Sequence, residues 1–529
     1  MAIQLNRSRI YWVRVLIVLG ICITTMNQFL QQIKISNRFK EDPEVNHAKP
    51  LKINHHTIDN DAILANFLMK KITEKDENGS KVGETKQRTR STKKEQERMN
   101  IIVFYGDDWR YDSIGSLNKF IKTPFLDDLA KKGMLFTQNA VTTSICWISR
   151  ACFATGQHFA RHKSLNRTDP VPYHSYWNET LFGKLMGNGY FTGSVGKWQP
   201  GEDIKDHMFN YSTNYEGFHF KNKRHITDMN VKDALHFLKE EFNGVDDPFA
   251  LFVNFFAPHA VDDTPYQYLA QKETEILYKK TKLPFGPSAT EKSWKNLPYF
   301  LDENDPGRKR WKNRFSSNIV AQTMLKKYYR LITGVDLACG KILQELERQD
   351  ELENTLIIFT TDNGYYLAEH GLADKWYAHQ ESIRVPLIIK DPRMSKDLIG
   401  TRNDALTLSI DIAPTILKAA GISVPDRMQG DDMSKLYTGN TAIANDSWRK
   451  GYYYEYPTIP RIESIKAVQA LVRKDYKYVY WPAYKYEELF DLLSDPYEEN
   501  NLFNSTEEKD VKKLEELRIE FQKVQAEAQ

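Results

Sequence analysis

The sequence is poor in cysteine and carries almost no net charge. Four cysteines among 529 residues exclude a disulfide-dense scaffold, and they lack the paired short spacings of zinc sites. A formal net charge of +3 is far from the strongly basic charge typical of nucleic-acid-binding proteins, so we expect no nucleic-acid partner. Hydrophobic residues make up 41% of the chain and aromatic residues 12%. These ordinary values exclude a disordered, collagen-like or coiled-coil chain and favour a globular protein with a large core.

The first thirty residues are typical of a targeting segment. Arg7, Arg9 and Arg14 precede an uncharged apolar run from Val15 to Met26. This run is shorter than the roughly 20 residues of a membrane span, which favours a cleaved signal peptide. If the Arg14 side chain extends to the membrane surface, residues 10–29 form a single membrane anchor instead. Residues 1–30 are therefore predicted to be a signal peptide or a signal anchor, which directs the rest of the chain to the non-cytoplasmic side, in an extracellular, periplasmic or membrane-anchored location.

Residues 31–98 are polar, and charges of both signs fill their second half. Almost no apolar periodicity occurs there, so we predict a linker or stalk. Asn-x-Ser/Thr sequons would permit glycosylation in the secretory pathway. They occur at Asn78, Asn166, Asn178, Asn210, Asn445 and Asn504.

From residue 99 the pattern is that of an α/β protein. Short apolar runs at residues 101–105, 250–256, 356–360 and 386–389 are typical of buried parallel strands. Between them, residues 321–348 carry apolar side chains at alternating steps of three and four, which predicts a long helix. We predict a mostly parallel sheet flanked by helices over residues 99–450. Aromatic strands such as 476–481 and a final helix from about Glu507 predict a smaller C-terminal subdomain, residues 451–529, with an antiparallel sheet.

Acidic side chains follow two of the predicted strands. Asp107 and Asp108 come after the first strand, and Asp362 and Asn363 come after the strand 356–360. In open α/β sheets the ligand site lies at the carboxyl ends of the strands. An all-oxygen set suits a hard cation, calcium or magnesium. The alternative is that each pair only caps a helix or turn.

A segment between these pairs resembles the signature of the sulfatase family. Residues 146–150 read Cys-Trp-Ile-Ser-Arg and are followed by Thr155-Gly156, where the family has Cys-x-Pro-Ser-Arg and a later Thr-Gly pair. Further motifs follow in the family's order. They are Gly106-Asp107-Asp108 before the signature, then Gly196-Lys197-Trp198, Ala257-Pro258-His259, Thr361-Asp362-Asn363-Gly364, Glu369-His370-Gly371-Leu372 with Lys375, residues 381–387, and Phe490-Asp491-Leu492 with Asp495-Pro496.

The resemblance implies a sulfuric ester hydrolase with an alkaline-phosphatase-like fold. Its cysteine, Cys146, would be converted to formylglycine (3-oxoalanine) by a formylglycine-generating enzyme. The modified Cys146 would hold one calcium ion, or magnesium in the alternative, together with Asp107, Asp108, Asp362 and Asn363. The hydrated aldehyde would attack the sulfur of a sulfate ester, which a thiol would not do.

Four other residues match catalytic positions of the family. Arg150 follows Cys146 by one helical turn and would hold the formylglycine and offset anionic charge. Lys197 and Lys375 match lysines that bind sulfate oxygens, and His259 matches the histidine that binds sulfate or protonates the leaving alcohol.

Two positions depart from the family pattern. Ile148 stands where the family has the proline read by the cysteine-oxidising machinery. Gln199 stands where many members have a histidine base, so His207, His162 or water would have to replace that base. These departures leave open a non-catalytic, membrane-tethered protein that binds sulfated glycans. A phosphodiesterase or phosphonate hydrolase of the same superfamily is a second alternative.

A secreted or anchored sulfatase would meet sulfated carbohydrate, although small sulfate esters remain an alternative. Basic residues at 308–312 and Arg314 lie in a polar insertion from about 271 to 317. They would either line an approach for a sulfated polysaccharide or form a charged solvated loop.

Overall fold

The structure, a computed structural model, describes residues 98–164, 176–198, 208–215, 217–242, 247–262, 264–439, 447–460, 462 and 464–529. The predicted signal segment, the stalk up to residue 97, and Asn78, Asn166, Gln199, His207 and Asn445 lie outside these residues. Within the described ranges, no helix is both long and apolar enough to cross a membrane.

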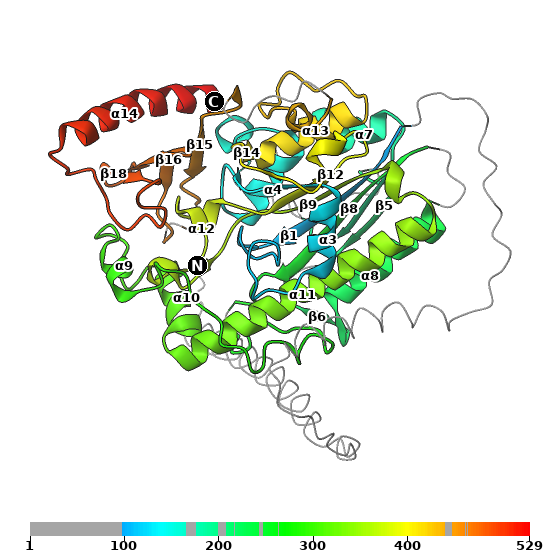
Figure 1. The fold of residues 1–529 in the computed structure, drawn as a ribbon, viewed down its shortest axis with the longest axis horizontal. Coiled ribbons are helices and arrows are strands. Elements are labelled where there is room, and N and C mark those ends of the chain that lie inside the picture. Colours follow the sequence, from blue (N-terminus) through cyan, green and yellow to red (C-terminus); the bar gives the residue numbers. More distant parts are fainter. Residues whose placement is uncertain are drawn as a thin grey trace, which may run out of the picture. The chain divides into compact units, whose positions relative to one another are not determined.

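An eight-stranded sheet forms the centre of the fold (Figure 1). Its strands, in order across the sheet, are β13 (Arg402–Asn403), β2 (Met134–Phe136), β12 (Leu387–Lys390), β9 (Thr355–Thr361), β1 (Asn100–Asp107), β8 (Phe249–Pro258), β4 (Phe191–Gly196) and β5 (Tyr211–Asn214). The apolar runs of β1, β8 and β9 are buried over their whole length.

The four adjacent strands β9, β1, β8 and β4 are parallel, which confirms the predicted mostly parallel sheet. β12 differs from the prediction, because it runs antiparallel to both β9 and β2. The chain between β9 and β12 forms only β10 (Tyr366–Leu367), β11 (Ala373–Asp374) and α12 (Gln380–Ile383), besides one short 3₁₀ turn. None of these is a crossover helix that would return the chain to the other edge of the sheet, so it re-enters in the opposite direction.

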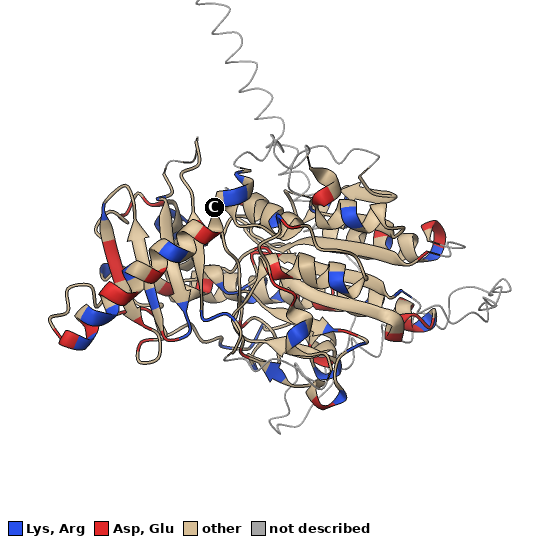
Figure 2. Ribbon diagram, turned by 90° about the horizontal axis from the view of Figure 1, so that it is seen from above, with Lys and Arg blue, Asp and Glu red and all other residues tan. Residues whose placement is uncertain are grey.

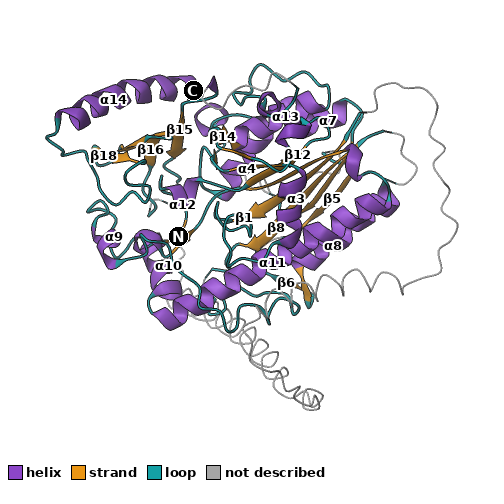
Figure 3. Ribbon diagram, viewed as in Figure 1, coloured by secondary structure: helices purple, strands orange, loops and turns teal. Residues whose placement is uncertain are grey.

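Helices cover both faces of this sheet (Figure 3). Alternate residues of β1 point to opposite faces, with Ile102 and Phe104 in one core and Ile101 and Val103 in the other. The first core is covered by α3 (Pro124–Lys132), α8 (Ile226–His236) and α11 (Asn318–Arg348). The second is covered by α4 (Cys146–Thr155), α7 (Leu181–Gly187) and α13 (Ile412–Ala419).

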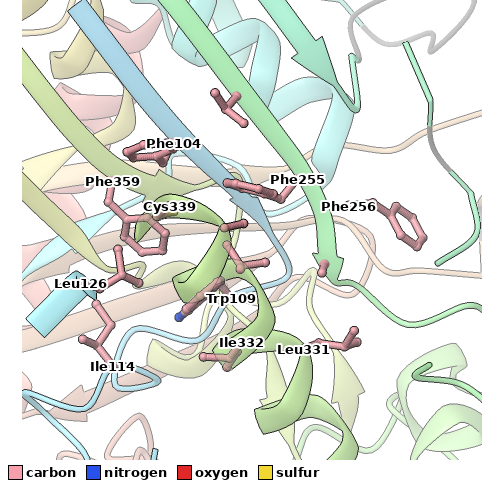
Figure 4. Packing of buried hydrophobic residues seen from close by; sticks show 14 of the residues in the cluster. Phe104, Trp109, Ile114, Leu126, Phe255, Phe256, Leu331, Ile332, Cys339 and Phe359 are labelled. Atoms are coloured by element: carbon pink, nitrogen blue, oxygen red, sulfur yellow. The ribbon is translucent and has the colours of Figure 1, made fainter. Parts of the chain in front are cut away.

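α11 is the long helix predicted from the apolar spacing. The residues of its predicted stripe, which includes Leu325, Ile332 and Cys339, are all buried. In the first core, Phe359 of β9 and Trp109 lie edge to face with ring centroids 5.0 Å apart, close to Cys339 (Figure 4). Trp109 follows the acidic pair of β1, so this packing anchors the loop that carries the pair.

The C-terminal part contains the predicted antiparallel sheet, made of β15 (Gly451–Tyr456), β16 (Val468–Arg473), β17 (Tyr476–Trp481) and β18 (Tyr486–Asp491). The terminal helix α14 (Glu508–Ala528) packs Leu517 and Phe521 on one face of this sheet. Its outer side carries charges of both signs (Figure 2). Tyr452 and Tyr454 of β15 point to the other face, into a core shared with α4.

The remaining elements are short. Two pairs of strands are β3 (Asn139–Ala140) with β14 (Thr407–Leu408) and β6 (Phe220–Lys221) with β7 (Arg224–His225). The helices are α5 (Phe159–His162), α9 (Glu291–Lys295) and α10 (Pro306–Phe315), and several short 3₁₀ helices and one π-helix complete the described part of the chain.

The basic segment of the insertion is a helix rather than the loop of one sequence interpretation, and only some of its basic residues are exposed. It forms α10, and the side chains of Arg308 and Arg314 are buried. The guanidinium of Arg308 lies 4.2 Å from the ring centroids of both Trp294 and Trp311. The insertion itself therefore supplies aromatic partners for this arginine, while Lys309 and Lys312 on the same helix are exposed.

Candidate active site

Six of the predicted site residues meet at the carboxyl edge of the four parallel strands. The strand ends carry Asp362 and Asn363 after β9, Asp107 and Asp108 at β1, His259 after β8, and Lys197 after β4. All are buried except His259, whose side chain is 17% exposed. Adjacent parallel strands end at the same edge, which is why residues so far apart in sequence come together.

Cys146 is the first residue of α4, and its side chain points into this cluster. Its Sγ lies 3.5 Å from Asp107 Oδ1. Burial, with the negative charge of Asp107 beside it, raises the pKa of the thiol well above its ordinary value. An unmodified Cys146 is therefore a neutral thiol and a poor nucleophile. Ile145, the preceding residue, offers no side-chain cap to α4. The positive end of the helix dipole therefore favours an anion placed beside Cys146.

Arg150 holds the strand ends together from one turn further along α4. Its Nη2 lies 2.9 Å from Asp362 Oδ2, and its Nε donates to the same oxygen at 3.0 Å. Its other terminal nitrogen, Nη1, donates to the carbonyl of Lys197 at 3.0 Å. Burial alone would raise the pKa of Asp362, but Arg150 and nearby lysines outweigh it and lower that pKa. Asp362 is therefore ionised and fixed in place.

Two buried oxygen atoms of the cluster lack hydrogen-bond partners. Asn363 donates through Nδ2 to Asp108 Oδ1 at 2.7 Å. This bond leaves Asn363 Oδ1 and Asp108 Oδ2, both buried, without a donor. One ligand atom from each of Asp107, Asp108, Cys146 and His259 lies within 4.8 Å of the others. Unpaired buried acceptors are costly, and a hard cation satisfies them, so the residues present fit a divalent metal.

The electrostatics of Asp107 agree with this fit. Burial and the neighbouring Asp362 raise its pKa to about 8, although Lys197 acts in the opposite direction. Two ionised carboxylates in one buried site repel each other, and a divalent cation would keep both deprotonated.

Two lysines and one histidine line the cluster. Lys197 forms a buried ion pair with Asp107, and Lys375 Nζ lies 2.5 Å from Asp108 Oδ1. The ring of His259 bonds through Nδ1 to the carbonyl of Ala260, so Nδ1 carries a proton there. Its Nε2 lies 3.4 Å from Asp108 Oδ2. Burial and both lysines lower the pKa of His259 well below its ordinary value.

Lys375 is held in an unusual stretch of backbone. Asp374 has φ of 73° and Trp376 has φ of 90°, so both neighbours of Lys375 are non-glycine residues in the left-handed region. Each such residue costs on the order of 1 kcal/mol or more and persists only where its surroundings enforce it. The conformation aims the Lys375 ammonium at the acidic pair of β1.

The structure thus brings together the residues proposed from sequence, including Asp107, Asp108, Cys146, Asp362 and Asn363. It also shows supporting residues that the sequence analysis did not identify. The hydroxyl of Tyr454 donates to the carbonyl of Trp376 at 2.6 Å and lies 2.5 Å from Ser144 Oγ. Tyr454 therefore connects the two segments that carry Lys375 and Cys146, and no motif marked it.

One base suggested from sequence has other partners. His162 Nε2 lies 3.2 Å from Cys152 Sγ, and its Nδ1 accepts from the Ser164 N–H at 3.1 Å. Burial lowers the pKa of His162 to about 3. Both ring nitrogens are occupied, so His162 does not serve the site as a proton acceptor. Of the glycosylation candidates within the described residues, Asn178, Asn210 and Asn504 are exposed.

Two family models match the chain. The model described as Sulfatase covers residues 99–422, and the model of the N-sulphoglucosamine sulphohydrolase C-terminal region covers residues 368–527. The chain is 27% identical over 496 residues to an N-acetylglucosamine-6-O-sulfatase of Bacteroides thetaiotaomicron, a match that covers 82% of this chain and 87% of that protein. It is 26% identical over 406 residues to the N-acetylglucosamine-6-sulfatase of Homo sapiens, which covers 68% and 67% of the two chains.

Solved structures share the fold. A protein solved in complex with its substrate D-glucosamine-2-N,6-O-disulfate superposes with a TM-score of 0.67 at 23% identity, over 82% of this chain and 98% of that one. The phosphonate monoester hydrolase of Agrobacterium radiobacter superposes with a TM-score of 0.66 at 19% identity, over 82% and 96% of the two chains. With the Sulfatase model spanning more than half of its length, the chain belongs to the sulfatase family, and it is a sulfuric ester hydrolase.

Proposed function

We propose that this sulfatase removes sulfate from a sulfated carbohydrate, using a formylglycine made from Cys146 beside one calcium ion. The observation that carries the proposal is the position of Cys146, with its Sγ 3.5 Å from Asp107 Oδ1 at an all-oxygen cluster that contains unpaired acceptors. The names of the two N-acetylglucosamine-6-sulfatases support a sulfated amino sugar as the substrate.

In this proposal the cluster of Asp107, Asp108, Asp362 and Asn363 holds the cation. Calcium takes six to eight oxygen ligands with flexible geometry, which suits three carboxylates and one amide better than the strict octahedron of magnesium does. When bound, the cation would polarise a hydroxyl of the hydrated formylglycine and so make it a stronger nucleophile.

Each of the other site residues then has its own role in the reaction. Lys197 and Lys375 hold the sulfate oxygens, where negative charge increases in the transition state. One hydroxyl of the hydrated formylglycine gives its proton to water and attacks sulfur, and the bond between sulfur and the leaving oxygen breaks. His259, protonated at Nε2 once sulfate is bound, gives that second ring proton to the leaving oxygen. The bound sulfate supports this role, because its negative charge raises the pKa of the neighbouring imidazole.

The second half of the reaction releases sulfate. The remaining hydroxyl of the modified residue loses its proton, the carbonyl forms again, and the bond between carbon and the sulfate oxygen breaks. Gln199 and His207 lie outside the described residues. Both ring nitrogens of His162 already have partners, the thiol of Cys152 and the backbone N–H of Ser164. His207 and water therefore remain the two proposed acceptors for this proton.

Mass spectrometry of the peptide that contains Cys146, from protein made in its own host, tests the proposal. We expect a peptide lighter than the thiol form by the difference between cysteine and formylglycine, together with sulfate release from N-acetylglucosamine-6-sulfate. An unmodified thiol and no sulfate release would instead support the glycan-binding alternative. Faster turnover of an aryl phosphonate than of an aryl sulfate would support a phosphonate hydrolase, whose fold this chain shares.

The same proposal includes entry into the secretory pathway through residues 1–30, with the catalytic domain outside the cytoplasm. Exposed sequons at Asn178 and Asn504 are consistent with such a location. Expression of the full chain and N-terminal sequencing of the mature protein would separate cleavage of this segment from anchoring.

A further inference from the structure

A group of four charged side chains lies between α10 and the active-site loops. Arg310 and Arg314 come from α10, Asp262 comes from the loop after β8, and Asp374 is the last residue of the two-residue strand β11. Arg314 Nη1 lies 2.9 Å from Asp374 Oδ1, and its Nη2 lies 2.5 Å from Asp262 Oδ1. Arg310 pairs with the same two carboxylates, at 2.9 Å from Asp262 and in a short contact with Asp374. Two positive and two negative charges balance within this group.

The two carboxylates belong to the loops that carry proposed catalytic residues. Asp262 follows His259 by three positions, and Asp374 immediately precedes Lys375. Because each arginine contacts both carboxylates, α10 fixes the distance between the two loops. The planar guanidinium, with donors in a fixed fork, suits such a bridge better than a lysine would.

The backbone at Lys375 needs this external support. Its neighbours Asp374 and Trp376 both have positive φ, and the side chain of Asp374 is only 1% exposed. The guanidinium of Arg310 also lies 5.2 Å from the ring centroid of Trp376. Arg310 therefore contacts the residues on both sides of Lys375, where the chain is strained.

Arg314 extends the same support toward the metal-binding residues. Its Nη1 donates to the hydroxyl of Tyr365 at 2.7 Å. The ring of Tyr365 stacks on Tyr328 with centroids 5.5 Å apart, and the Tyr328 hydroxyl donates to the carbonyl of Asp108 at 2.7 Å. One arginine is thus connected with three loops of the site.

We propose that Arg310 and Arg314 are positioning residues, which hold Lys375 and His259 at a fixed separation for the sulfate group. This inference rests on the proposed roles of those two residues. Both terminal nitrogens of each arginine are paired with Asp262 and Asp374, so the arginines have partners inside the protein. Two arginines of a basic segment that resembled a polyanion-binding patch in the sequence thus act inside the protein.

Arg310→Gln is the variant that tests this proposal. The Arg310 side chain is 30% exposed, so its loss disturbs the core less than loss of Arg314, which is 1% exposed. Lys309→Ala is the matched control, since Lys309 is exposed on the same helix. We expect Arg310→Gln to lower kcat/KM for an aryl sulfate by about 10- to 100-fold, mostly through kcat, because small displacements of catalytic groups have effects of this size. Lys309→Ala should match the wild type.

A double-mutant cycle with Lys375→Ala separates positioning from a general loss of structure. If Arg310 acts through Lys375, Arg310→Gln should have little further effect on activity in the Lys375→Ala background. Effects that multiply in the double variant would overturn the inference, as would equal loss of activity in Lys309→Ala.

Hydrogen exchange supplies a measurement that does not require sulfatase activity. Amides of residues 373–377 should exchange faster in Arg310→Gln than in the wild type and in Lys309→Ala, while amides of β1 stay unchanged. Unaltered exchange at residues 373–377 would contradict the proposal. If the wild-type protein releases no sulfate, the proposed function fails, and the exchange result still decides whether the arginines hold this loop.

Discussion

The Tyr328 hydroxyl of α11 donates a hydrogen bond of 2.7 Å to the carbonyl oxygen of Asp108. The same hydroxyl accepts from the N–H of Arg110 at 3.1 Å. A core helix thereby fixes the backbone on both sides of Trp109, at the point where the proposed metal ligands begin. Groups that orient metal ligands in this way typically contribute 10- to 100-fold to metal affinity.

We therefore predict that Tyr328→Phe weakens calcium binding by about 10-fold while the protein remains folded. Isothermal titration of the metal-free protein with calcium measures the effect. Tyr329→Phe is the control, because Tyr329 is a buried neighbour on the same helix whose ring packs against Tyr278. Equal calcium affinity in the wild type and Tyr328→Phe would contradict this role.

Removal of divalent metal should destabilise the protein. Asp107 and Asp362 repel each other in the buried cluster, and a bound cation relieves that repulsion. We expect calcium at about 100 times its dissociation constant to add roughly 2.7 kcal/mol to the free energy of unfolding, seen as a higher melting temperature than in chelator. Asp108→Asn should lose most of this shift. Magnesium at the same concentration should give a smaller shift, and a larger one would assign the site to magnesium.

Replacement of His259 should affect poor substrates more than activated ones. If His259 protonates the leaving oxygen, His259→Gln should slow hydrolysis of a sugar sulfate by about 100-fold or more. A nitrophenyl sulfate, whose leaving group needs little protonation, should lose much less. Steady-state rates for the two substrates check this prediction. The same loss for both substrates would indicate that His259 binds sulfate without donating a proton.

The C-terminal sheet should make stability depend on pH. Glu488 is buried on β18 and accepts a hydrogen bond from Trp481 Nε1 at 2.7 Å. Burial raises its pKa from 4.5 to about 7. The folded state therefore holds this proton more tightly than the unfolded chain does. The resulting stability is fully present below about pH 4.5 and is lost as the pH rises to about 7.

Thermal unfolding between pH 4.5 and 8 tests this prediction. Glu488→Gln should remove a decline of roughly 3 kcal/mol from the pH profile, since one pKa unit corresponds to about 1.4 kcal/mol. Glu487→Gln, at the adjacent position, is the control. Arg518 outweighs the effect of burial there and lowers the pKa of Glu487, so that variant should leave the decline in place. A profile for Glu488→Gln identical to the wild type would refute the assignment.

Much of the site could be predicted because its residues follow strands. The apolar runs ending at Asp107 and Thr361 predict parallel strands, and parallel strands place their ends at one edge. The signature around Cys146 then supplied the remaining chemistry. The direction of β12 could not be predicted, because an apolar run has the same pattern in either orientation.

The sequence could not identify the supporting residues for a related reason. Tyr328 follows the apolar spacing of α11, so its ring predicts core packing and nothing reveals the contact of its hydroxyl. Arg314 resembles a surface charge in sequence, because its partners Asp262 and Asp374 lie 52 and 60 positions away. Contacts of this kind depend on tertiary structure, which local patterns do not encode.

The hydrogen bond from Tyr454 to Trp376 has a consequence for synthesis of the chain. It joins residues 78 positions apart, and Glu498 also accepts from the backbone N–H of Gln380, 118 positions earlier. A ribosome releases the strands with the acidic residues well before it releases these partners. In a growing chain the strands of the metal pocket and the arginines of α10 would thus be available first, and the segment around Lys375 would gain its last contacts only after residue 498 has emerged. Desulfation would then begin only with a nearly finished polypeptide.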